Sequence, residues 1–122
     1  ELKKNNYQTL IKEEKRIKAC RQAINEHILG GGISRKELAE LVHLSESRLS
    51  HLFKAKMGVS IKNYIVWTRL KHTILATLEQ ETTLLEAAYY AGFYDAAHFS
   101  RAFQKMFGLN PSVVYNSSIL QI

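Results

Sequence analysis

The chain has 122 residues, of which 46% are hydrophobic, and a formal net charge of +6. This length allows one domain with a sizeable core and leaves little room for a second large one. The positive charge favours a polyanionic partner, although proteins that bind no nucleic acid also carry such an excess.

The cysteine content and the apolar segments narrow the class of protein further. Cys20 is the only cysteine, so an internal disulfide and a cysteine-based zinc site are excluded. No apolar run reaches the roughly 18 to 20 residues that span a membrane, and no signal-peptide core follows the basic start. We therefore expect a soluble protein of the reducing cytoplasm. Because the chain begins with Glu1 and not with Met, we also expect a piece of a longer protein or a processed chain.

An amphipathic helix is predicted after a polar start. Residues 1–14 carry few apolar side chains and are interpreted as a linker or a helical extension. From about 15 to 29, apolar residues recur at spacings of three and four, and these residues are Ile17, Cys20, Ile24 and Ile28. They share one helix face, and the three glycines at 30–32 end the helix.

Two short helices joined by a tight turn are predicted next. Ser34 and Glu37 form a capping box for a helix over about 35–42. After a turn, Ser45 caps a second helix over about 46–57. The buried face of this second helix is predicted to hold Leu49, Leu52, Phe53 and Met57.

A longer helix is predicted from Ser60 to about Leu78, and its length suits a rigid spacer. Apolar residues at helical spacing give it a wide buried face. The residues expected on that face are Ile61, Tyr64, Ile65, Trp67, Leu70, Ile74, Leu75 and Leu78.

The rest of the chain repeats the pattern of two short helices. A helix over about 84–91 leads through a turn to Asp95, which caps a helix that ends near Phe107. The inward side chains of this last helix are predicted to be Phe99, Phe103 and Met106. A final short helix starts at Pro111, with Asn110 as its cap, and the tail at 117–122 is frayed. No strand is predicted, so the fold class is all-α.

The two pairs of short helices are near copies of each other. The first copy runs Leu38, Ala39, Val42, Leu44, Ser45, Leu49, Ser50, Phe53 and Gly58, and the second runs Ala87, Ala88, Ala91, Phe93, Asp95, Phe99, Ser100, Phe103 and Gly108. The offset is 49 residues up to Phe93 and 50 afterwards, as if the second turn had gained one residue. Each copy has the layout of a helix-turn-helix, whose second helix can lie in a DNA major groove. Two copies in one basic domain predict a duplex read at two places.

The second copy, AAYYAGFYDAAHFSRAFQKMFGLNPSVVY, closely resembles the signature of the AraC/XylS family of bacterial transcription regulators. Its most telling residues are Ala88, Gly92, Phe93, Phe99, Arg101, Phe103, Gly108, Pro111 and Tyr115. The first copy, ELAELVHLSESRLSHLFKAKMGVS, also resembles that family, and Tyr64-Ile65 with Arg69-Leu70 is similar to its linking helix. The chain departs from the usual pattern at Thr73, Ala87, Ala91 and Asn116.

This resemblance implies a fold and a domain organisation. The fold would have about seven helices, in two helix-turn-helix subdomains joined by a long linking helix. The DNA-binding domain would cover residues 15–116. Its recognition helices, over about 46–57 and 95–107, would enter successive major grooves on one side of the duplex.

The side chains expected to face DNA bases are those that protrude from the two recognition helices. They are Ser47, Arg48, Ser50 and His51 in the first copy, and Ala96, Ala97, His98, Ser100 and Arg101 in the second. An arginine can bind guanine O6 and N7 with two hydrogen bonds, and alanines can pack on thymine methyl groups. Arg101 could equally serve the fold or a phosphate, and His51 could be a solvated surface residue.

Phosphate contacts are expected to supply most of the affinity. The candidate cations are Lys54, Lys62 and Lys105. The helix amino termini near Ser34, Ser60, Thr83 and Asn110 add outward N–H groups, and any single lysine could simply be solvated.

Other chemistries find little support in the residue pattern. The aromatic residues Phe53, Trp67, Phe93, Phe99 and Phe103 fall at buried spacings, which favours a core over base stacking. Asp95 and His98 lack a nucleophile or an oxyanion site, so no catalytic residue is assigned. The five histidines lack the ligand spacing of a metal site, so neither a metal nor another cofactor is expected.

The function predicted is sequence-specific binding of double-stranded DNA by a bacterial transcription regulator. A monomer should cover two half-sites one helical turn apart, roughly 34 Å. The resemblance implies RNA polymerase as a further partner and leaves open a dimer formed through a missing regulatory domain. The main alternative is a helical protein-interaction module with a basic surface, and RNA binding is disfavoured because no exposed aromatic platform is predicted.

Overall fold

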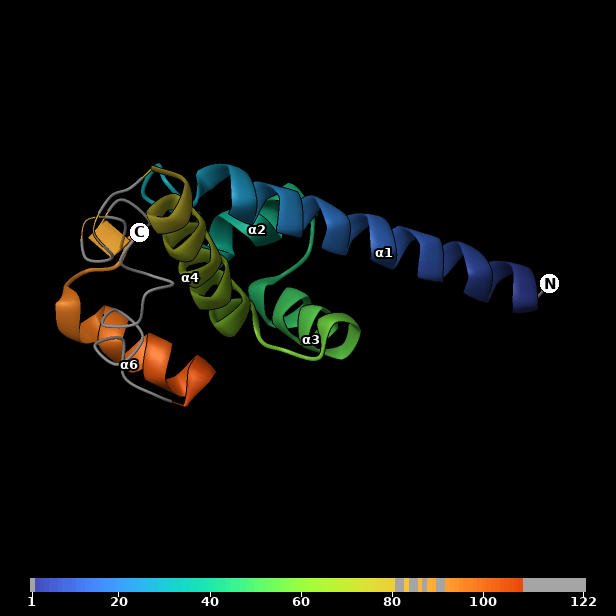
Figure 1. The fold of residues 1–122 in the computed structure, drawn as a ribbon. Coiled ribbons are helices and arrows are strands. Elements are labelled where there is room, and N and C mark those ends of the chain that lie inside the picture. Colours follow the sequence, from blue (N-terminus) through green and yellow to red (C-terminus); the bar gives the residue numbers. More distant parts are fainter. Residues whose placement is uncertain (1, 81–82, 84–85, 87, 90–91, 109–122) are drawn as a thin grey trace. The chain divides into compact units, whose positions relative to one another are not determined.

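The computed structural model describes residues 2–80, 83, 86, 88, 89 and 92–108. Within these residues the chain forms five α-helices and no strand, which confirms the all-α class (Figure 1). The helices are α1 (Leu2–His27), α2 (Arg35–Leu41), α3 (Glu46–Met57), α4 (Ile61–Gln80) and α6 (Ala96–Phe107). Of the helix predicted over 84–91, Glu86, Ala88 and Tyr89 are described and are helical. The final short helix predicted from Asn110 lies outside the described residues.

The chain divides into two compact units. The first consists of residues 1–27 and 32–64, and the second of residues 28–31 and 65–122. The division therefore falls inside α4, and the two helix-turn-helix copies lie in different units.

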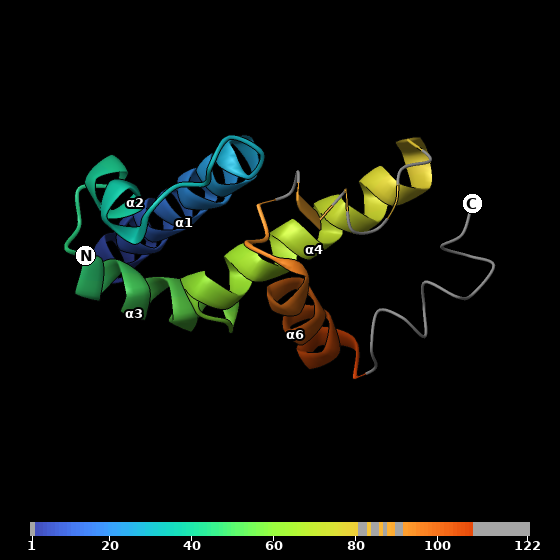
Figure 2. The ribbon, with the colours of Figure 1, turned by 90° about the vertical axis from the view of Figure 1, so that its left-hand side faces the viewer.

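In the first unit, α1, α2 and α3 pack on one another (Figure 2). The predicted inward face of α1 is confirmed, because Ile17, Cys20 and Ile24 are buried. Ile28 is buried as well, but it follows the end of α1 and belongs to the second unit. Burial raises the pKa of the Cys20 thiol. The helix begins at Leu2 and so includes residues 2–14, which were interpreted as a linker or a helical extension.

Local hydrogen bonds set the ends of α2 and α3. The Glu37 N–H donates to Ser34 Oγ at 3.0 Å, and the Ser34 N–H donates to Glu37 Oε1 at 3.2 Å, which confirms the capping box. The bond from the Ser34 N–H lowers the pKa of the Glu37 carboxyl, because it stabilises the ionised form. The Arg48 N–H donates to Ser45 Oγ at 3.1 Å, so α3 begins at the predicted residue.

In the second unit, the core joins α4 and α6. Its buried members are Leu70, Ala88, Phe93, Phe99 and Phe103. The rings of Phe93 and Phe99 meet edge to face with centroids 5.3 Å apart. The predicted cap of α6 is confirmed, because the His98 N–H donates to Asp95 Oδ1 at 2.7 Å. The shared core with Leu70 packs the second helix-turn-helix against α4.

Three predicted core residues are wrong. Trp67, Leu75 and Met106 are 40%, 41% and 42% exposed. The buried side of α4 instead follows Leu70, Thr73 and Thr77, and the two threonine hydroxyls donate to the carbonyl oxygens four residues back at 2.8 Å. Leu75 lies about 140° around the helix from Leu70, Trp67 lies at the rim of the core, and Met106 lies in the last turn of α6 beyond Phe103.

The repeat seen in the sequence is also a repeat of backbone conformation. The turn contains a residue of positive φ in both copies, His43 at 59° and Gly92 at 94°. The next residue donates its N–H to a carbonyl five residues back in both copies, from Leu44 to Ala39 and from Phe93 to Ala88. These pairs are 49 residues apart, whereas the caps Ser45 and Asp95 are 50 apart. The added residue is therefore Tyr94.

Replacing Gly92 with alanine should destabilise the second unit by more than the strain of a side chain at positive φ, because the new Cβ also meets Arg69. A side chain at φ 94° is strained, and a Cβ there would lie 3.2 Å from Arg69 Nε. We expect the free energy of unfolding, measured by urea titration, to fall by about 2 kcal/mol. Gly108→Ala is the control, because Gly108 has φ 76° and no atom within 4 Å of its Cβ position. Equal losses for both variants would show that the Arg69 contact contributes nothing.

Removing the ring of Phe103 should open a cavity in the second core. Phe103 is 2% exposed and contacts the ring of Phe99, with centroids 5.8 Å apart. Phe103→Ala should lower the free energy of unfolding by about 3 to 5 kcal/mol in calorimetry. The exposed neighbour Met106 provides the control, and Met106→Ala should change stability little. A melting curve of Phe103→Ala that matches the parent protein would contradict the described core.

Candidate nucleic-acid interface

The outer face of α3 carries three of the four residues predicted to face bases from this helix. Successive residues in a helix are about 100° apart, so His51 lies nearly opposite the buried Leu49. His51, Ser47 and Arg48 are exposed. Ala55 is exposed on the same face and was not among the residues predicted from the sequence.

Ser50 is oriented differently from its neighbours. The residue is half-buried, and its hydroxyl oxygen is buried with no hydrogen-bond partner among the described residues. Ser50 lies only about 60° around the helix from the buried Phe53, which turns it toward the core. The expectation that it faces outward is therefore wrong, and its contact with a base stays a prediction that needs the side chain to rotate.

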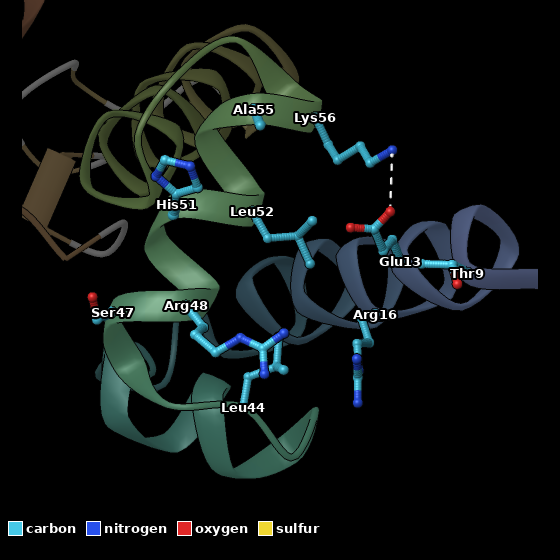
Figure 3. A pocket seen from close by; sticks show the side chains of 10 residues that line it. All are labelled: Thr9, Glu13, Arg16, Leu44, Ser47, Arg48, His51, Leu52, Ala55 and Lys56. Carbon is cyan, nitrogen blue, oxygen red and sulfur yellow. Dashed lines mark ion pairs between the residues drawn. The ribbon is translucent and has the colours of Figure 1, made fainter. Parts of the chain in front are cut away.

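A groove of about 630 Å³ runs along one flank of α3, between this helix and α1 (Figure 3). Its lining residues are Thr9, Glu13, Arg16, Leu44, Ser47, Arg48, His51, Leu52, Ala55 and Lys56. The Arg48 side chain points from α3 toward α1, and Leu44 lines the same groove (Figure 3). Three candidate base-facing residues therefore border the groove as well as the outer face.

Two polar contacts hold α1 beside the first helix-turn-helix. Arg16 Nε donates to the carbonyl oxygen of Val42 at 3.0 Å, at the end of α2. Lys56 Nζ lies 3.6 Å from Glu13 Oε1, and each of these two side chains is 28% exposed. The groove is thus lined by cations and by one carboxylate that already has a cationic partner.

The outer face of α6 is chemically different from that of α3. Ala97 and Arg101 occupy the positions of Ser47 and His51, and both are exposed. Ala96 is also exposed, whereas His98 and Ser100 are half-buried. Gln104 is exposed at the position of Lys54 and was missed by the sequence analysis.

His98 is held in one orientation by its neighbours. The Tyr94 N–H donates to His98 Nδ1 at 3.4 Å, and the imidazole meets the Phe93 ring edge to face with centroids 5.3 Å apart. Because Nδ1 accepts this bond, the proton of the neutral ring is on Nε2. His98 therefore presents a hydrogen-bond donor, which suits guanine O6 and N7 or thymine O4.

Tyr94 is a candidate contact that the sequence analysis did not single out. Its side chain is 89% exposed, and it immediately precedes the cap of α6. It has no counterpart in the first copy, because it is the residue added to the second turn. The change of offset from 49 to 50 residues was the signal that could have identified it.

The predicted phosphate-facing lysines are all exposed. Lys54 lies on α3, Lys62 on α4 and Lys105 on α6. Asn110 lies outside the described residues. Among the side chains that the structure does describe, no group of three or more His, Cys, Asp or Glu could hold a metal ion.

None of the described helices has the length and apolar character needed to cross a membrane.

Comparisons with known proteins identify the family. The family described as "Helix-turn-helix domain" matches residues 38–117. The arabinose operon regulatory protein of Escherichia coli strain K12 is 30% identical over 99 residues, which are 81% of this chain and 34% of that protein. The Msm operon regulatory protein of Streptococcus mutans is 31% identical over 83 residues, which are 68% of this chain and 30% of that protein. The chain thus spans about a third of the length of these relatives.

A solved structure supports the same relationship. The C-terminal domain of AraT, a response regulator from Geobacillus stearothermophilus, is similar with a TM-score of 0.70 and 26% identity, over 80% of this chain and 81% of that one. The chain belongs to the AraC family of helix-turn-helix, DNA-binding transcription regulators, and this is a family of regulators, not of enzymes.

Proposed function

We propose that the domain binds double-stranded DNA in a sequence-specific manner, with two recognition helices in successive major grooves. The first is α3, predicted over about 46–57, and the second is α6, predicted over about 95–107. One observation carries the proposal: both helices are capped at the same place and present equivalent outward positions 50 residues apart, Ser47 and His51 in one and Ala97 and Arg101 in the other. Exposed positions of this kind are what base reading in a major groove requires.

The proposed interface keeps the residues chosen from the sequence. The base-facing set is Ser47, Arg48, Ser50, His51, Ala96, Ala97, His98, Ser100 and Arg101, and the phosphate-facing set is Lys54, Lys62, Lys105 and Asn110. The DNA-binding domain would cover 15–116, in two helix-turn-helix subdomains joined by α4, with about seven helices. Residues 1–14 and 117–122 would be additions at its two ends.

The regulatory context is part of the same proposal. A monomer would occupy two half-sites one helical turn apart, roughly 34 Å, so binding would not require a dimer. At a bacterial promoter the protein would act in the cytoplasm by recruiting or positioning RNA polymerase. If the protein forms a dimer, the contact would be made by a regulatory domain outside this chain.

Selection from random duplex DNA tests the proposal directly. Sequencing of the retained pool should show two short motifs about one turn apart. One motif would mean that only one unit reads bases. No motif would favour the alternative function, a helical module whose basic surface binds an acidic protein.

Two substitutions in α3 should then separate base reading from phosphate binding. His51→Ala should relax the preference for one or two base pairs in one half-site, because its ring lies at the centre of the outer face. Lys54→Ala should weaken binding to all sequences alike and reduce the salt slope by about 0.9. Fluorescence anisotropy on the selected site and on single-base variants measures both effects. Uniform effects from both substitutions would contradict the assigned roles.

The second unit should read thymine methyl groups through Tyr94 and its neighbouring alanines. Ala96 and Ala97 offer no hydrogen bond, and the exposed ring of Tyr94 adds apolar surface beside them. Replacing thymine by deoxyuridine removes only the C5-methyl group, and we expect a loss of about 0.8 kcal/mol for each methyl group in contact.

A double-mutant cycle that combines a Tyr94 substitution with the replacement of thymine by deoxyuridine measures the contribution of the Tyr94 ring. Tyr94→Ala should remove part of the deoxyuridine effect in the second half-site, and Tyr94→Phe should retain it because the ring is kept. Thymine replacements in the first half-site serve as the control. If Tyr94→Ala leaves every deoxyuridine effect unchanged, its ring does not contact a thymine.

A further inference from the structure

The long helix α1 forms a groove along one flank of α3, the first proposed recognition helix. Glu13 of α1 faces Lys56 of α3 across it, and Arg16, Arg48 and Leu52 also line it (Figure 3). Arg16 is held in place by its 3.0 Å bond from Nε to the Val42 carbonyl, which uses one of its five N–H donors. Its remaining donors can bind an anion. The groove therefore combines pre-positioned cations with an apolar floor at Leu44 and Leu52.

The geometry of a major groove places a phosphate strand along this flank. The groove of B-DNA is about 12 Å wide, and a helix with its side chains is about 10 to 12 Å across. A helix that fills the groove thus has a sugar–phosphate strand on each side. With His51 directed at the bases, Arg48, Leu52 and Lys56 lie about 60° to 140° around the helix from it, on the side of α1.

We infer that the groove between α1 and α3 receives the sugar–phosphate strand that borders the first half-site. This inference rests on the proposed function. Arg16 and Lys56 are then further phosphate-binding residues, and Leu44 and Leu52 contact the deoxyribose. Charge complementarity between the cations of the groove and the phosphates selects a DNA strand as the occupant.

Glu13 acts against this binding. It lies 3.6 Å from Lys56 Nζ, so Lys56 is partly neutralised before DNA arrives. A cation that is already paired with a carboxylate releases fewer counterions when a phosphate replaces its partner. Glu13 also repels the phosphate that approaches. The carboxylate therefore limits the affinity of the first unit and lowers its dependence on salt.

Glu13→Gln should consequently bind the selected DNA site more tightly than the parent protein. The slope of log affinity against log salt should become steeper by about 0.9, so that the gain shrinks about threefold between 50 and 200 mM salt. Glu14→Gln is the matched control, because it changes the net charge equally at an exposed residue outside the groove. Fluorescence anisotropy at several salt concentrations measures both slopes.

Two further variants place the effect in the groove. Lys56→Gln should weaken binding more in the Glu13→Gln background than in the parent, because Lys56 is unpaired there. Arg16→Gln should reduce the salt slope, and Arg16→Lys should restore it. Circular dichroism melting verifies that each variant is folded. A methylphosphonate linkage, which removes one phosphate charge, should abolish the Glu13→Gln gain at a particular position bordering the first half-site.

The outcomes distinguish this inference from the proposed function. Equal effects of Glu13→Gln and Glu14→Gln, or no effect of either, would overturn the groove as a DNA contact while sequence-specific binding persisted. A gain that no methylphosphonate position removes would also overturn it and would indicate a general charge effect. Loss of all sequence preference in the parent protein would instead reject the proposed function itself.

Discussion

The direction of each recognition helix depends on one backbone residue in the left-handed region. His43 in the first copy and Gly92 in the second reverse the chain before a side chain caps the next helix. Glycine adopts this conformation freely, whereas a residue with a Cβ pays roughly 1 kcal/mol or more for it. The first unit accepts that cost at His43. In the second unit a Cβ would also meet Arg69, whose burial lowers the pKa of its guanidinium, so glycine meets two requirements at once.

Local chemistry explains why so much of the fold was predictable. The start of α3 and the capping box of α2 are set by side chains three residues apart, and these were identified from the sequence alone. The buried faces were less predictable, because helical periodicity does not say which neighbour covers a face. Thr73 and Thr77 show the reason: each hydroxyl bonds to its own helix, which removes most of the cost of burial and lets polar residues take core positions.

The candidate site shows the same division. The outer positions of α3 and α6 follow from the residues buried opposite them, so Ser47, His51 and Arg101 could be placed by counting along the helix. The groove between α1 and α3 could not be predicted in this way, because its two walls are about 40 residues apart in the sequence. Its α1 wall is formed by Thr9, Glu13 and Arg16, and the first two lie in the segment that the sequence left open as a linker or a helical extension. The predicted outward orientation of Ser50 was wrong for a related reason, because Ser50 lies at the border between the inner and outer faces of α3.

The two units differ in the chemistry at the start of α3 and of α6. The cap of α3 is the neutral Ser45, and the acidic Glu46 that follows it is paired with Arg35 at 3.4 Å. The cap of α6 is the carboxylate of Asp95, which opposes the partial positive charge at that helix terminus. The start of α6 therefore attracts a phosphate less strongly than the start of α3 does. Cations line the flank of α3, whereas the exposed Tyr94, Ala96 and Ala97 give the start of α6 an apolar surface.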